Sequence, residues 1–227
     1  MKKRTAFIGA ILSLIPLGQP LLIKTGFGLS TVGLILAVPE KVNAESAEFY
    51  FARALKMGKK GDYYGAISDF TKAIKINPND SQAYYNRGWN KGKLKDNYGA
   101  ISDYTKAIEI NPQYAKAFYN RGYRKNKLND YYGAISDFTK AIEINPQYAK
   151  AYNNRGFSKI NLEDYYGAIS DYSKAIEINP QYPDAFKNRS ISKENIGDIQ
   201  GACADAKKAV SLGDTASDNE NWIKDNC

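Results

Sequence analysis

The chain has 227 residues, with 32 Lys or Arg, 24 Asp or Glu, a formal net charge of +8 and no histidine. It therefore lacks the most common general base and metal ligand, and it also lacks a glycine-rich phosphate loop and a cysteine pair at zinc-binding spacing. We expect a protein that is not an enzyme and that uses no cofactor and no metal.

The first 44 residues have the pattern of a secretory signal peptide. A basic head, Met1–Arg4, precedes two apolar stretches at 6–23 and 26–38. The sequence Val-Asn-Ala at 42–44 then offers small residues at the two positions that a signal peptidase recognises, and charged sequence begins at Glu45. We expect cleavage near residue 44 and export to a periplasm, a thylakoid lumen or the medium.

An uncleaved membrane anchor is the alternative for this segment. The first apolar stretch is close to the length that spans a bilayer, although Pro16 and Pro20 weaken such a helix. In that case residues 6–38 associate the protein with a membrane. Both alternatives place the rest of the chain outside the cytoplasm.

The charge that remains after this segment argues against a nucleic-acid partner. Residues 1–44 contain five basic residues and one acidic residue, so the net charge falls from +8 to +4 for the rest of the chain. Both signs are also evenly mixed there, whereas nucleic-acid binding needs a clustered basic excess.

From residue 47 the sequence repeats with a period of 34 residues. Within a unit, apolar residues recur at helical spacing from Ala134 to Ile144, and Asn145-Pro146 ends that helix. A further helix is predicted from about Tyr148 to Leu162. Two helices cannot bury their apolar faces alone, so neighbouring units must stack. The predicted units are 47–80, 81–114, 115–148, 149–182 and 183–216.

The conserved spacing within units is similar to that of a known family. Counted from the first residue of a unit, position 4 is aromatic, 8 is Gly, 20 is Ala, 24 is aromatic, 27 is Ala and 32 is Pro. In the third unit these are Phe118, Gly122, Ala134, Phe138, Ala141 and Pro146. The pattern resembles the tetratricopeptide repeat (TPR) family. The resemblance implies an all-α, right-handed α-solenoid of five helix-turn-helix units, the fifth of which diverges, with Ala206 at position 24 and Asp214 at position 32.

Two positions depart from the family pattern in every unit. Position 7, usually leucine in the family, is arginine, and position 23 is aspartate. Because a guanidinium group in an apolar interface is costly unless it is paired, we predict ion pairs that tie helix to helix, within a unit or to the next. The predicted pairs involve Arg53, Arg87, Arg121, Arg155 and Arg189 with Asp69, Asp103, Asp137, Asp171 and Asp205.

The resemblance also implies a binding groove along the first helix of each unit. Position 6 carries a row of asparagines whose carboxamides can pair with a peptide backbone, and aromatic residues at positions 5 and 9 flank it. Lysines at position 2 resemble part of the carboxylate clamp of TPR co-chaperones. The predicted groove residues are Asn86, Asn120, Asn154 and Asn188; Tyr85 and Tyr119; Trp89, Tyr123 and Phe157; and Lys116 and Lys150.

Alternatives remain open for this groove. The asparagines can be copies left by duplication, and the aromatics can fill the packing between adjacent helices. We expect a non-enzymatic protein-interaction scaffold with an unidentified protein or peptide partner. A carbohydrate-binding module of the cell envelope is the alternative, since aromatic and Asn side chains also suit sugars.

The tail, residues 217–227, has the pattern of a short helix that covers the last apolar face. Cys203 occupies position 21, where the earlier units have isoleucine, and Trp222 and Ile223 suit a capping helix. A disulfide between Cys203 and Cys227 would fix the cap in an oxidising compartment. Two unpaired thiols, or an intermolecular bond through Cys227, are the alternatives.

Overall fold

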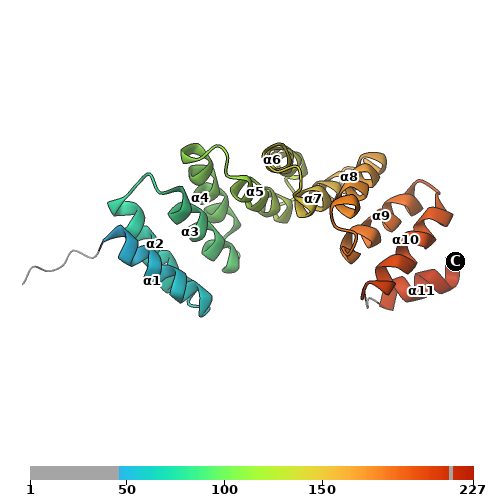
Figure 1. Cartoon of the computed structure of the whole chain (residues 1–227), viewed down its shortest axis with the longest axis horizontal. Coiled ribbons are helices and arrows are strands. Elements are labelled where there is room, and N and C mark those ends of the chain that lie inside the picture. The colour runs from blue at the N-terminus through green and yellow to red at the C-terminus, as the bar shows by residue number, and fades with distance from the viewer. Residues whose placement is uncertain (1–45, 215–216) are drawn as a thin grey trace, which may run out of the picture. The chain divides into compact units, whose positions relative to one another are not determined.

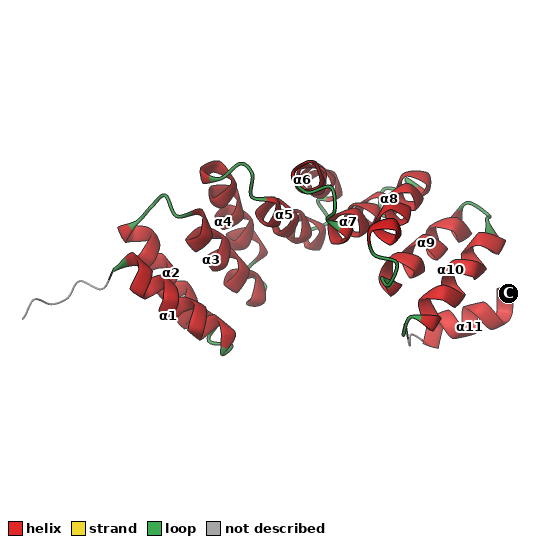
Figure 2. Ribbon diagram, viewed as in Figure 1, coloured by secondary structure: helices red, strands yellow, loops and turns green. Residues whose placement is uncertain are grey.

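The computed structural model describes residues 46–214 and 217–227, and side chains of the last helix from Trp222 onward. The expected targeting segment therefore lies outside the described residues. Those residues form helices and short loops with no strand (Figure 2). The helices are α1 (Ala47–Lys59), α2 (Tyr63–Ile76), α3 (Ser81–Lys93), α4 (Asn97–Ile110), α5 (Ala115–Lys127), α6 (Tyr131–Ile144), α7 (Ala149–Ile160), α8 (Tyr165–Ile178), α9 (Pro183–Asn195), α10 (Ile199–Ser211) and α11 (Ser217–Asn226).

Each predicted unit contains one pair of antiparallel helices, and the pairs stack in chain order (Figure 1). Every helix packs on the next one along the chain. In addition, the first helices of neighbouring units contact one another, from α1 and α3 through to α7 and α9. We call the surface that α1, α3, α5, α7 and α9 share the A-helix face. The all-α repeat fold predicted from the sequence is confirmed.

The ends of the second helix follow from two local motifs, of which the fifth unit has only the aspartate cap. An aspartate at position 16 caps its N-terminus: the Asp130 carboxylate accepts a 2.9 Å hydrogen bond from the Gly133 N–H. A β-carbon on Gly133 would collide with that carboxylate, which explains the glycine at position 19. At the other end, Asn145 is extended and its side chain accepts from the Gln147 N–H, so the helix stops at the Asn-Pro pair.

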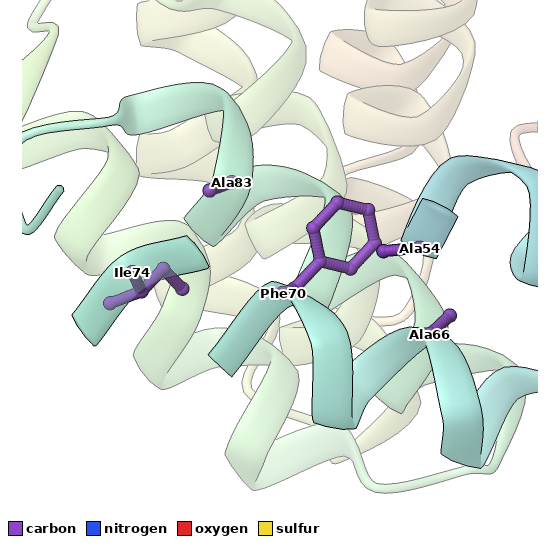
Figure 3. Packing of buried hydrophobic residues seen from close by; sticks show 5 residues of the cluster. All are labelled: Ala54, Ala66, Phe70, Ile74 and Ala83. Atoms are coloured by element: carbon purple, nitrogen blue, oxygen red, sulfur yellow. The ribbon is translucent and has the colours of Figure 1, made fainter. Parts of the chain in front are cut away.

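The core of each unit is built from small residues around one aromatic ring. Position 24 is fully buried in the first four units, where it holds Phe70, Tyr104, Phe138 and Tyr172. Figure 3 shows the first of these, with the Phe70 ring pointing toward Ala54 of α1. In the next three units position 8 is glycine, because an added β-carbon would lie 2.8–3.1 Å from the aromatic ring at position 24. Close helix approach therefore depends on this small residue.

The helix α11 covers the end of the last unit. It packs on α10, and a disulfide joins Cys203 of α10 to Cys227 at the end of the tail. The Trp222 indole N–H donates a 2.8 Å hydrogen bond to Glu194 Oε1 at the end of α9. Among the helices described, none has the length and apolarity needed to cross a bilayer.

Candidate functional site on the A-helix face

The arginine and aspartate of each unit form one two-pronged ion pair within that unit. In the third unit, Arg121 Nη2 lies 2.7 Å from Asp137 Oδ1 and Nε lies 2.9 Å from Oδ2. The Asp137 side chain is only 3% exposed. The remaining guanidinium nitrogen, Nη1, donates a 3.0 Å bond to Thr105 Oγ1 of the preceding unit. One arginine thus connects two helices of its own unit and one helix of the unit before it.

A third member of this network was not predicted from the sequence. Lys125, at position 11, lies 2.8 Å from Asp137 Oδ2. The same lysine pairs occur in the second, fourth and fifth units. In the first unit position 11 is Met57, and Lys72 of α2 contacts Asp69 instead. The signal was available, because position 11 is lysine in units two to five and position 25 is Thr or Ser in every unit that another unit follows. These groups all serve the fold rather than a ligand.

The asparagine row of the predicted groove also has contacts between units. Asn120 Nδ2 donates a 2.8 Å bond to the Tyr85 hydroxyl of the preceding unit, and Asn154 Nδ2 donates a 3.0 Å bond to the Tyr119 hydroxyl. Asn188 continues the pattern with a 3.2 Å bond to Asn153 Oδ1. Asn86 instead donates to the Gln82 carbonyl of its own helix.

The asparagine oxygens remain available. Within the part of the chain that the structure describes, Oδ1 of Asn86, Asn120 and Asn154 has no hydrogen-bond partner. The row therefore presents acceptors, while most of its donors are used between units.

The tyrosines at position 5 pack against two other aromatic rings of their own units. The Tyr85 ring stacks on Tyr114 at 4.9 Å and lies 5.7 Å from Tyr104. Tyr119 has equivalent contacts with Tyr148 and Phe138. Burial raises the pKa of both Tyr85 and Tyr119 above its ordinary value. Both rings are half-buried, and Tyr85 also lines the first of two hollows in the A-helix face.

The aromatics at position 9 also line hollows in the A-helix face. The first hollow, of about 300 Å³, lies between α1 and α3; the second, of about 400 Å³, lies between α5 and α7. Trp89 lines the first, and Tyr123 and Phe157 line the second. Phe157 is 44% exposed. The hollows also include Asn86 and Asn154 from the asparagine row.

Basic side chains surround these hollows. Lys59 lines the first and Lys127 lines the second, both at position 13. Lys93 Nζ lies 4.8 Å from the centroid of the Trp89 ring, and Lys127 Nζ lies 5.5 Å from that of Tyr123. The two lysines predicted at position 2, Lys116 and Lys150, are exposed, but they line neither hollow. The position-13 lysines were missed at the sequence level, although their recurrence in three units was visible.

The chemistry that this face offers is recognition. It presents aromatic surfaces, carboxamide oxygens and ammonium groups. Among the described residues, no group of three or more His, Cys, Asp or Glu side chains could hold a metal ion.

Comparisons with known proteins agree on the fold. Sequence models described as "Tetratricopeptide repeat" match residues 47–80, 81–114 and 149–182, and one described as "TPR repeat" matches residues 122–162. No curated protein sequence matches the chain.

Several solved structures superpose on the chain. The crystal structure of MamA is 26% identical, with a TM-score of 0.68, and the match covers 73% of this chain and 96% of MamA. YrrB, described as "a TPR protein with an unusual peptide-binding site", is 21% identical with a TM-score of 0.70; the match covers 80% of this chain and 94% of YrrB. PilW, described as a "widely conserved type IV pilus biogenesis factor", is 23% identical with a TM-score of 0.67, and the match covers 78% of this chain and 82% of PilW. At such identities the last two comparisons concern the fold alone.

Proposed function

Since this chain belongs to the tetratricopeptide repeat family, we propose that it is a non-enzymatic scaffold that holds an extended segment of a partner protein along the A-helix face. The family and the fold support a protein-interaction scaffold. The finer claim, an extended segment in this groove, depends on which side chains the fold leaves unused.

The observation that carries the proposal is the pair of hollows on the A-helix face. Trp89, Tyr123 and Phe157 line these hollows, and Tyr85 contributes to the wall of the first. Asn86 and Asn154 lie in the same hollows and offer unpaired oxygens. A peptide backbone N–H can donate to such an oxygen whatever side chain it carries. The face can therefore bind a backbone while the aromatics select side chains.

A photo-crosslinking experiment tests this placement. A photoreactive residue is introduced at Tyr123, in the second hollow, and in a separate variant at Tyr132, which is 77% exposed on α6. Both side chains are tyrosines, so the pair differs in position and not in kind. With an envelope extract as the source of partners, we expect a discrete crosslinked product from Tyr123 and none of the same mass from Tyr132. A product formed through Tyr132 alone would place binding on the opposite helices and refute the proposal.

A carbohydrate ligand is the second candidate, favoured by one observation. In the first hollow the flat Trp89 side chain lies beside Asn86 and Asn90, which suits an apolar sugar face with hydroxyl groups at its edge. A sugar should depend on this one tryptophan. An extended segment should instead depend on aromatics in both hollows.

Export is part of the proposal. The disulfide between Cys203 and Cys227 fits an oxidising compartment, and the first 44 residues have a signal-peptide pattern. N-terminal sequencing of the native protein should find a chain that begins at or near Glu45. An intact Met1 in the membrane fraction would favour the anchor instead.

A further inference from the structure

We propose that the segment bound by this face is acidic and carries two bulky apolar side chains about five or six residues apart, one for each hollow. This inference rests on the proposed function and adds to it a ligand class and a register. Its support comes from the distribution of unpaired charge, the equivalence of the two hollows, and the residue that separates them.

Uncompensated positive charge is concentrated on the A-helix face. The helices α3, α5 and α7 contain no Asp or Glu. Six of their basic side chains pair, two by two, with three buried aspartates of the partner helices, so three of these six positive charges are compensated. Five others have no ion pair with any described residue: Lys93, Lys116, Arg124, Lys127 and Lys150.

The partner helices show the opposite arrangement. On α4, α6 and α8 each exposed lysine pairs with a glutamate three residues further on, at 2.6–3.0 Å. The charge there is balanced within the helix itself. In these three units the unpaired positive charge therefore lies on the A-helix face, and an acidic ligand complements it.

The two hollows have corresponding walls. Each contains a position-9 aromatic, a position-6 asparagine and a position-13 lysine. In the first these are Trp89, Asn86 and Lys59. An apolar side chain can pack against the aromatic while an adjacent carboxylate reaches the ammonium group. The same kind of ligand residue therefore fits both places.

Arg124 separates the two hollows. At the α3–α5 junction, its guanidinium fills the space that corresponds to the hollows on either side. A β-carbon on Gly92 would lie 2.5 Å from Arg124 Cζ. Nη1 also donates a 3.1 Å bond to the Gly92 carbonyl, and the guanidinium lies over the Tyr123 ring at 5.2 Å. A ligand must pass over this arginine to reach both hollows.

The spacing of the two anchors follows from the helix packing. The hollows lie two helix–helix junctions apart along the A-helix face. Neighbouring packed helices have axes about 8–10 Å apart, which gives roughly 16–20 Å between the hollows. An extended chain rises about 3.3 Å per residue, so that distance corresponds to about five or six residues.

A peptide panel tests the ligand class and the register with the full chain. The probes are fluorescein-labelled twelve-residue peptides of Glu and Ser with two Phe residues, placed either six residues apart or two residues apart. A third peptide carries Lys in place of Glu. Fluorescence anisotropy gives the affinities. We expect the widely spaced acidic peptide to bind at least about tenfold more tightly than either of the others, because only it can fill both hollows and match the charge.

Variants of the protein connect that preference to the hollows. Trp89→Ala and Phe157→Ala should each weaken the widely spaced acidic peptide by about tenfold and remove most of the spacing preference. Tyr132→Ala is the matched control, because it removes an exposed aromatic from α6, and it should change nothing. Lys127→Gln should reduce the preference for Glu over Lys peptides, whereas Lys140→Gln on α6 should not.

Three outcomes would overturn the inference. Equal affinity for the two peptide spacings would refute the proposed separation of the two apolar side chains. Equal affinity for the acidic and the basic peptides would refute the proposal that the ligand is acidic. Tighter binding of polygalacturonate, with displacement of the peptide, would make the ligand an anionic glycan. Crosslinking of a partner at Tyr123 together with any of these results would leave the proposed function standing. No crosslink at Tyr123 would count against that function independently of the peptide panel.

Discussion

The buried aspartate of the ion-pair network supports a quantitative prediction about stability. Asp137→Leu leaves two cations without their shared partner, Arg121 and Lys125, whose side chains are 17% and 21% exposed. Breaking a buried ion pair by removing one partner costs roughly 3–5 kcal/mol. Both cations retain some contact with water, so we expect a loss near the lower end, about 3 kcal/mol.

Removing the arginine should have a smaller effect. In Arg121→Leu the Asp137 carboxylate keeps Lys125 at 2.8 Å and so is not left unpaired, while leucine restores the apolar packing usual at this position in the family. We expect a loss of about 1–2 kcal/mol, the net value of the charged hydrogen bonds that disappear. In the double variant the loss should be smaller than the sum of the two single losses by at least about 1 kcal/mol.

Urea unfolding followed by circular dichroism measures these free energies. Glu143→Leu is the control, because it breaks an exposed pair with Lys140 in which both side chains are more than half exposed, and it should cost no more than about 0.5 kcal/mol. Equal, small losses for Asp137→Leu and Arg121→Leu, with additive effects in the double variant, would show that the network is weak and solvated.

Further predictions concern the core, the cap and alkaline pH. The Tyr172 hydroxyl is buried and has no hydrogen-bond partner among the residues that the structure describes. Tyr172→Phe should therefore raise the free energy of unfolding by about 1 kcal/mol and Phe138→Tyr should lower it by about 1–3 kcal/mol, as measured in urea. Removing the disulfide by Cys203→Ser should cost roughly 3 kcal/mol on the chain-entropy account, with the increase in amide exchange confined to α10 and α11. Burial raises the pKa of several tyrosines, that of Tyr114 to about 12. Because burial raises the tyrosine pKa in the folded state, the protonated hydroxyl group contributes to the free energy of unfolding. That contribution is complete below the unfolded pKa of about 10 and is lost as the pH rises toward 12. The urea concentration at the unfolding midpoint should therefore decrease as the pH is raised from about 9 to about 11.5, and it should decrease less in Tyr114→Phe. An unchanged midpoint would contradict the burial of these rings.

Much of the fold could be predicted because it depends on spacing within one unit. The period of 34 residues, the Asn-Pro helix ends and the aspartate caps are local signals, and helix pairs appear where they indicate. The arginine–aspartate pairs could be predicted for the same reason, because positions 7 and 23 face each other across the helix pair of a single unit.

The candidate site was harder to predict, because it depends on how one unit is placed against the next. The hollows lie between the first helices of neighbouring units, while the guanidinium of Arg124 lies against Gly92 at the α3–α5 junction. Whether a junction stays open depends on residues of two units together, which the residue spacing within one unit does not contain. The hydroxyl that accepts from Asn120 comes from the preceding unit for the same reason.

At the first three junctions, contacts between position 12 of one unit and position 10 of the next restrict the order in which the units can follow one another. Gly58 lies against Asn90, Gly92 against Arg124, and the Ser158 hydroxyl donates to Asn126 Oδ1 at 2.8 Å. An in-frame deletion of residues 115–148 would preserve every ion pair within the remaining units, but it would place Ser158 against Gly92 and leave a void where the guanidinium had been. Inserting a copy of those residues directly after themselves would instead press Arg124 of the copy against Asn126. Units that are almost identical in sequence are therefore not interchangeable, and a gain or loss of one unit by recombination would require compensating substitutions at the new junction.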